Sequence, residues 1–286
     1  MREGRGMKVK DEIVKGGLCA AALLSVAVLL IVVGYVFVNG IGVISLDFLL
    51  ESPYRFEYGG IFPQIIGSLC LVAVCLIFAV PMGVASAIYL AEYASDNVIT
   101  RTVRFFVECL AGIPSIVIGL FGLVFLVYYL NLGICLLSGG LALGFMILPW
   151  TVRASEEAIK TVPQTYREAS LALGVSKWRT IRSVVLKNAY PGIITGILLG
   201  MGKAIGETAV VLLTAGSGLE SFLPKSLFDP VASLPVYIYM MATQGHTSAA
   251  YSRTFGASLV LIMMFLVISI FALLLRNRYI RRMGRG

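Results

Sequence analysis

Long apolar windows recur along this chain and constrain its fold more than any other feature. Each is long enough to cross roughly 30 Å of hydrocarbon as a helix, which takes about 20 residues. The clearest windows are residues 17–38, 65–90, 105–130, 191–214 and 255–275, and a sixth, 132–152, contains glycines and Pro149. We count the sixth because glycine is common in membrane helices. A composition that is 58% hydrophobic and 13% charged agrees, so we expect an all-α integral membrane protein with six transmembrane helices.

The basic residues predict the orientation of these helices. Six crossings place both termini on one side, together with every lysine and arginine except Arg55, Lys225 and Arg253 on the other side and Lys203 within a span. Because basic loops stay in the cytoplasm, we expect both termini there. Membrane topology therefore accounts for the net charge of +8, which does not indicate nucleic-acid binding. The first window is too long for a signal peptide and is interpreted as a retained helix.

The cytoplasmic segment 153–190 carries repeated helix-capping signals. We expect Ser155 to cap "EEAIKTV", Pro163 to end it, and Gly174 to adopt a left-handed conformation after "QTYREASLAL". Ser176 can cap "KWRTIRSVVL", and Pro191 can begin the next span. This pattern predicts a helix-turn-helix against the inner mouth of the spans. On the other side, "SLPVYIYMMATQG" within 216–254 is too short to cross and predicts an interfacial or re-entrant helix.

Motifs of covalent and metal chemistry do not occur in this sequence. "GMGKA" resembles a phosphate-binding loop, but its glycine spacing is wrong and Ala204 stands where a hydroxyl must hold magnesium. No Ser-His-Asp set, HExxH or CxxC occurs, and His246 is the single histidine. We expect the cysteines to be small buried side chains. The chain is predicted to be no enzyme and to need no cofactor or metal; any ATP hydrolysis belongs to another chain.

Two full charges, Lys203 and Glu207, lie within the apolar window 191–214. On a helical wheel of about 100° per residue they share one face with Thr214 and with a stripe of small residues, Gly192, Gly196 and Gly200. Such a stripe lets another helix approach closely, and intramembrane charges face protein or water. The pair is either a structural ion pair or part of a substrate pathway, and we favour the pathway because intramembrane ionisable residues are usually functional.

Pro114 predicts a break in the third span. A proline frees a backbone carbonyl, which Ser115 can satisfy, and Ser115 can also line a path. A plain kink with no pathway role is the alternative. We therefore treat Lys203, Glu207, Ser115 and Thr214 as candidate pathway residues.

The stretch "EASLALGVSKWRTIRSVVLK" resembles the EAA loop of ABC importer permeases, whose pattern is Glu-Ala-Ala, three residues, Gly, nine residues, then Ile-x-Leu-Pro. Glu168, Ala169, Gly174 and Leu186 fit this pattern. Ser170 replaces the second alanine, Val184 the isoleucine and Lys187 the proline. The resemblance implies that this helix binds a groove on a separate ATP-hydrolysing subunit and transmits its closure.

The resemblance extends over about residues 59–275 to PstA-type permeases of phosphate importers. It rests on "GGIFPQIIGSL", "AVPMGVASAIYLAEYA", "GIPSIVIGLFG", "MILPWTVRASEEAIKTVP", "AIGETAVVLLTAG" and "LPVYIYMMATQG". It implies a type I ABC importer permease in the cell membrane of a prokaryote, with an ATPase dimer, a second PstC-like permease and an external phosphate-binding protein as partners. In such relatives the position of Lys203 is often arginine, which binds phosphate with a bidentate fork that lysine lacks.

These expectations divide the chain into four regions. They are a cytoplasmic tail (1–16), the first span with its external loop (17–63), the transmembrane domain (64–276, with coupling helices in 155–187) and a basic cytoplasmic tail (277–286). The predicted function is phosphate import by alternating access. Alternatives are a permease for another oxyanion such as molybdate or sulfate, a non-conducting signalling or scaffold subunit, and an ion-gradient carrier. The capped cytoplasmic helices argue against the carrier, which needs no ATPase.

Overall fold

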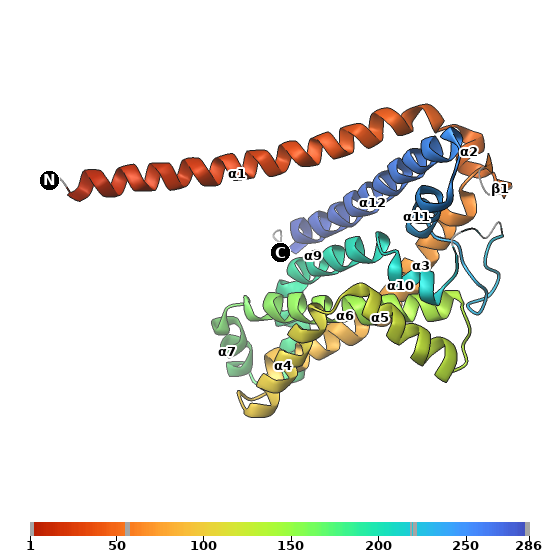
Figure 1. The fold of residues 1–286 in the computed structure, drawn as a ribbon. Coiled ribbons are helices and arrows are strands. Elements are labelled where there is room, and N and C mark those ends of the chain that lie inside the picture. Colours follow the sequence, from red (N-terminus) through yellow and green to blue (C-terminus); the bar gives the residue numbers. More distant parts are fainter. Residues whose placement is uncertain (1–2, 55–57, 218, 220–221, 284–286) are drawn as a thin grey trace.

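The computed structural model describes residues 3–54, 58–217, 219 and 222–283. Arg55 and the outermost residues of both predicted tails lie outside these ranges. The chain is almost entirely helical (Figure 1). In order, the elements are α1 (Glu3–Gly40), η1 (Ile41–Val43), α2 (Leu46–Leu50), β1 (Pro53–Tyr54), β2 (Tyr58–Gly59), α3 (Phe62–Ile88), η2 (Tyr89–Tyr93), α4 (Val98–Ala111), α5 (Ser115–Gly122), η3 (Leu123–Tyr129), α6 (Leu136–Lys160), α7 (Gln164–Ala172), α8 (Lys177–Thr180), η4 (Ile181–Val185), α9 (Leu186–Ile205), α10 (Ala209–Thr214), α11 (Leu234–Gln244) and α12 (Ser248–Met283).

The described helices include five that are long and apolar enough to cross a membrane, and a sixth if a bent pair counts as one span. The five stretches are Val14–Val43, Phe62–Tyr93, Leu136–Lys160, Lys177–Ile205 and Ser248–Arg281. The bent pair is Val98–Ala111 with Ser115–Tyr129, at an angle of 99°. The expected break before Ser115 is confirmed. Pro114 has an extended backbone, with φ −57° and ψ 137°, and α5 begins directly after it.

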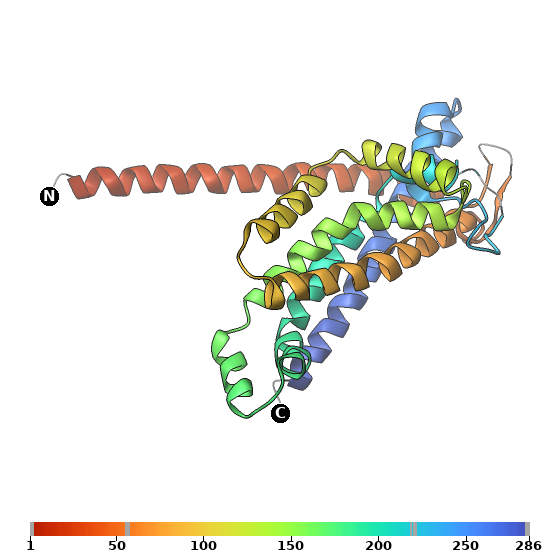
Figure 2. The same cartoon turned by 90° about the horizontal axis from the view of Figure 1, so that it is seen from below.

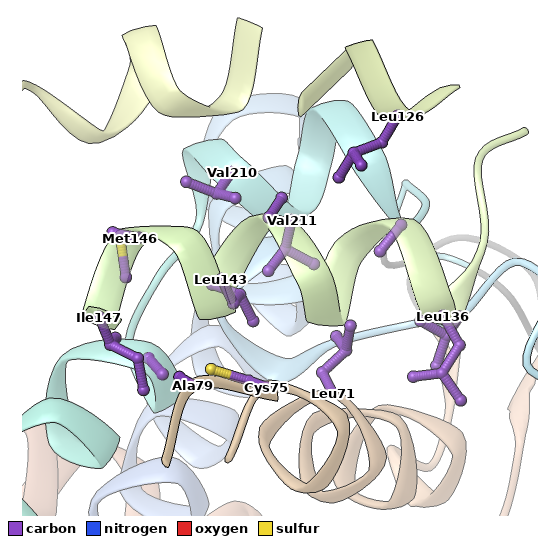
Figure 3. Close-up of a cluster of buried hydrophobic side chains, with 14 of the residues drawn as sticks. Leu71, Cys75, Ala79, Leu126, Leu136, Leu143, Met146, Ile147, Val210 and Val211 are labelled. Carbon is purple, nitrogen blue, oxygen red and sulfur yellow. The ribbon is translucent and has the colours of Figure 1, made fainter. Parts of the chain in front are cut away.

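Glycines explain why the window 132–152 forms a span despite its composition. A Cβ added at Gly140 would lie 2.4 Å from Val74 Cγ1, and one at Gly144 would lie 2.5 Å from Phe78 Cδ1. The glycines of α6 therefore face bulky side chains of α3 at close range, as small residues do in membrane helix pairs. The main core lies beside this contact, where Leu71 and Leu143 meet Val211 of α10 (Figure 3).

Three boundaries differ from expectation. "EEAIKTV" is not a separate helix, because α6 continues to Lys160 with Ser155 fully buried inside it. Packing of Ala158 and Ile159 keeps this part of α6 helical, so the polar caps read from the sequence do not act there. Pro191 does not begin a span but lies inside α9. The window 191–214 is two helices, because α9 ends at Ile205 and α10 starts at Ala209.

The first helix stands apart from the others. In Figures 1 and 2, α1 runs beside α12 at one end and then diverges from the bundle toward the N-terminus. Where they meet, the rings of Tyr35 and Phe255 make an edge contact with centroids 5.6 Å apart. The stretch Val14–Val43 has a mean hydropathy of 2.8, so its exposed surface is suited to lipid.

At the end of the molecule opposite to the two termini, α2, the hairpin β1–β2 and α11 form a cap (Figure 1). The expected short helix is present as α11, and Leu234, Tyr237 and Met241 bury it against the bundle. Arg253 of α12 donates to the carbonyl oxygen of Gly59 and lies over the ring of Phe48. The five cysteines are free; Cys75 and Cys135 are buried as expected, whereas Cys19 and Cys109 are exposed.

Candidate functional site

Two interrupted helices lie side by side in this chain. One is broken at residues 112–114, between α4 and α5, and the other at residues 206–208, between α9 and α10. The segments after the breaks pack tightly. A Cβ added at Gly119 would lie 3.1 Å from Val210 Cα, and one at Gly122 would lie 2.9 Å from Thr214 Cγ2. These contacts advance in the same direction along both helices, so α5 and α10 are packed in parallel, each directly after a break.

The charged pair is arranged differently from the wheel prediction. Because α9 ends before Glu207, the two residues do not share a helix, and the described residues include no ion pair between Lys203 and Glu207. The Glu207 carboxylate instead accepts from the backbone N–H of Ala209 at 3.1 Å, at the start of α10. Lys203 is exposed, and its Nζ lies 4.9 Å from the centroid of the Trp150 ring on α6. Trp150 is a contact that sequence reasoning missed.

The other two candidate pathway residues differ in exposure. Ser115 is half-buried at the first position of α5, beside the break. Thr214 is fully buried, and its hydroxyl donates to the carbonyl oxygen of Val210 at 2.7 Å. Ser115 therefore lies directly after the first break, Glu207 lies within the second, Lys203 lies in the last turn of α9 before it, and Thr214 lies in the core. Irregular backbone at such breaks is tolerated in membranes where it lines a cavity or is covered by protein.

The glycine stripe contacts another helix of the same chain. A Cβ at Gly196 would lie 2.3 Å from the Cβ of Ala154, and one at Gly192 would lie 2.7 Å from the Cβ of Ala158. At Gly200 the nearest atom would be 3.7 Å away, which is an ordinary contact. The stripe thus packs α9 against α6, and this packing places Lys203 next to Trp150.

The segment that resembles an EAA loop forms a helix-turn-helix with one exposed face. Gly174 has a φ of 76° in the turn, as expected. Glu168 and Ala169 are exposed, and Leu173 is 83% exposed. The departure at Ser170 has a structural reason: its side chain is buried, and its hydroxyl shares a hydrogen bond of 2.9 Å with the hydroxyl of Thr180 on α8. Val184 and Leu186 are half-buried, and Leu186 packs against the cluster that contains Ile159.

Ion pairs gather at the same end of the bundle as the helix-turn-helix. Glu156 accepts from both Arg104, at 2.9 Å, and Lys160, at 2.6 Å. Arg101 makes an exposed pair with Asp96 and, through this hydrogen bond and its charge, lowers the pKa of that carboxyl. A further pair, Glu92 with Arg167, has little exposed side-chain surface and escaped sequence reasoning. This end of the bundle is therefore rich in charge of both signs.

Comparison with known proteins identifies the family of this chain. The family of binding-protein-dependent transport system inner membrane components matches residues 79–285. The chain belongs to this family. It is a multi-pass membrane permease subunit of an ABC transporter, whose ATP hydrolysis is carried by a separate subunit, and members of the family work with a binding protein.

Curated relatives and solved structures agree with this assignment. The probable ABC transporter permease YqgI of Bacillus subtilis (strain 168) is 36% identical over 93% of this permease and 94% of its own length. The phosphate transport system permease PstA 1 of Mycobacterium tuberculosis (strain ATCC 25618 / H37Rv) is 40% identical over 80% of this permease and 73% of its own length. PstA of Xylella fastidiosa (strain Temecula1 / ATCC 700964) is 35% identical over 91% of each chain.

Two ABC importers share the fold of this permease. A bacterial ABC transporter involved in the import of alginate matches with a TM-score of 0.65, at 16% identity over 95% of this chain and 99% of that one. The inward-facing MetNI methionine transporter matches with a TM-score of 0.60, at 18% identity over 78% of this chain and 95% of that one. The expected type I importer fold is thereby confirmed.

Proposed function

We propose that this permease carries inorganic phosphate into the cell. The support is the identity of 35–40% with permeases named for phosphate transport, over most of the chain. The single structural observation that carries the proposal is the exposed Lys203 in the last turn of α9, at one of two interrupted helices whose following segments pack together. Interrupted membrane helices of this kind form substrate sites in transporters, and a cation there lowers the electrostatic cost of holding an anion.

In the proposed cycle, a phosphate-binding protein delivers the anion to the side of the α2–α11 cap. A second, PstC-like permease completes the path, and Ser115, Lys203 and Glu207 line it. One subunit of the ATPase dimer binds the exposed face of α7 around Glu168, Ala169 and Leu173, the other binds the second permease, and closure of the dimer moves the permeases between outward- and inward-open states. Both termini lie in the cytoplasm, in keeping with the basic residues at that end.

The carboxylate of Glu207 has a distinct role in this proposal. It caps the start of α10 and leaves Lys203 unpaired, so the ammonium is available to an anion. In another state of the cycle Glu207 competes for Lys203 and favours release of the anion.

The test is ATP-driven phosphate uptake by the complete transporter in vesicles, with Lys203→Gln as the variant. We expect uptake to fall by about tenfold or more, the equivalent of at least one charge-assisted contact. Lys225→Gln, at an exposed lysine in the 216–254 segment, is the matched control and should transport normally. Normal uptake in Lys203→Gln would remove lysine from the pathway.

Competition separates the substrates that this site can accept. Unlabelled molybdate or sulfate should not displace labelled phosphate at equal concentration if phosphate is the substrate. Stronger competition by either oxyanion would identify it instead. Uptake that survives deletion of this chain would assign it a signalling or scaffold role.

A further inference from the structure

A buried ion pair ties the exposed helix-turn-helix back to a membrane span. Arg167 of α7 donates from Nη2 and Nε to Glu92 Oε1, at 2.7 and 3.0 Å. The two side chains are only 13% and 7% exposed. Glu92 lies in η2, the π-helical turn that directly follows α3. Glu92 and Arg167 therefore meet here although they are 75 positions apart in the chain.

The same guanidinium also holds the end of α6. It donates to the carbonyl oxygen of Ile159 at 2.9 Å and to that of Val162 at 2.6 Å. Carbonyls in the last turn of a helix lack intrahelical partners, and an arginine can supply the missing donors. Arg167 therefore joins three elements, α7, α6 and the end of α3, through four hydrogen bonds.

Four hydrogen bonds and low exposure of both side chains make this connection stiff. Exposed ion pairs contribute little and rearrange easily, whereas breaking a buried pair leaves a charge without a partner in a poorly solvated site. The helices α3 and α6 are themselves locked by the close approach of Gly140 to Val74 and of Gly144 to Phe78. A displacement of α7 consequently enters the α3–α6 pair at two points, the backbone of residues 161–163 and the Glu92 carboxylate.

We propose that Arg167 and Glu92 are positioning residues that transmit the displacement of α7 to the α3–α6 pair. Without this link, α7 loses its direct connection to Glu92 at the end of α3, and the connecting residues 161–163 and the Ser170–Thr180 contact with α8 have to carry its motion. The inference rests on the proposed function in that α7 receives its motion from the ATPase.

The test uses the complete transporter in proteoliposomes and measures ATP hydrolysed per phosphate imported. Glu92→Gln removes the charge but keeps an acceptor, and Arg167→Lys keeps the charge but cannot make the four-way contact. We expect both variants to raise the ratio by about fivefold or more, because hydrolysis continues while transport fails to follow. Asp96→Asn, which breaks an exposed pair with Arg101 at the same end of the bundle, is the control and should leave the ratio unchanged.

A merely structural role gives a different result, in which hydrolysis and import fall together and the ratio stays constant. That result, or an equal rise in Asp96→Asn, would overturn the proposal. If Glu92→Gln fails to assemble with the ATPase, Glu92→Asp is used, which keeps the carboxylate and shortens its reach. An unchanged ratio in Glu92→Asp would equally overturn the proposal, and a raised ratio would support it.

Failure of the proposed function is distinguishable from failure of this inference. If the wild-type transporter imports no phosphate, the proposed substrate is wrong, but the proposed role of Arg167 and Glu92 is not contradicted. Stimulation of ATP hydrolysis by the binding protein loaded with its own substrate then replaces the import ratio. Loss of that stimulation in Glu92→Gln, with unchanged basal hydrolysis, supports the link, and full stimulation contradicts it.

Discussion

Lys203 Nζ lies 4.9 Å from the centroid of the Trp150 indole ring, so the ammonium rests against an aromatic face. An ammonium over an indole is attracted by the ring's negative face and is restrained in direction without being neutralised. Trp150 can therefore orient the lysine and still leave its charge for an anion.

The first prediction concerns this ring. Trp150→Leu should raise the KM for phosphate uptake by about two- to fivefold, because a cation–π contact at an exposed site contributes about 0.5–1 kcal/mol. Trp150→Phe keeps an aromatic face and should show a smaller change. Uptake rates measured against phosphate concentration give the result. Equal KM values for the two variants would show that the ring acts only by its bulk.

The second prediction concerns the contact between α6 and α9. Gly196→Ala should lower stability by about 1–3 kcal/mol, because the added methyl would meet Ala154 Cβ at 2.3 Å in a packed interface. Gly200→Ala adds the same methyl on the same stripe, but at 3.7 Å from its nearest neighbour, and should be neutral or stabilising. Thermal unfolding in detergent compares them. A similar loss in both would contradict the contact geometry.

The third prediction concerns binding of the ATPase. Leu173→Asp places a charge on an apolar side chain that is 83% exposed on the helix-turn-helix, and should weaken co-purification of the ATPase by about tenfold or more. Val98→Asp is the matched control, at a residue 79% exposed at the start of a different helix, α4. If Val98→Asp releases the ATPase as readily as Leu173→Asp, the binding face is wrongly assigned.

The fourth prediction concerns the hydrogen bond between Ser170 and Thr180. Ser170→Ala restores the residue of the EAA pattern but leaves the buried Thr180 hydroxyl without its partner, at a cost of about 1–3 kcal/mol. Combining it with Thr180→Val removes both hydroxyls and should recover most of the loss. A double-mutant cycle on thermal unfolding measures the coupling, expected at about 0.5 kcal/mol or more. Strict additivity would show that the two hydroxyls do not interact.

Much of the architecture could be predicted because it depends on local patterns. Apolar length defines a span wherever the chain must satisfy its own backbone in lipid. The break before Ser115 follows from the missing N–H and fixed φ of Pro114, and the turn at Gly174 follows from its tolerance of positive φ. Each of these depends on residues close together in the chain.

The remaining features depend on contacts between distant segments. The helical wheel that placed Lys203 and Glu207 on one face assumed an unbroken helix. In the structure α10 is a separate helix that packs against α5, and no local sequence pattern reveals that contact. Likewise, Ser155 resembles a helix cap in the sequence, but the packing of Ala158 and Ile159 against other helices keeps α6 continuous through it. Glu92 and Arg167 are 75 residues apart, and an acidic residue at a span end is otherwise an ordinary feature.

The glycine contacts of α5 with α10 limit how these two helices can move. Because Gly119 and Gly122 leave no room between the two short helices, neither can tilt without carrying the other. The α5–α10 pair is therefore one rigid unit, and any rearrangement at one interruption must be accompanied by a rearrangement at the other.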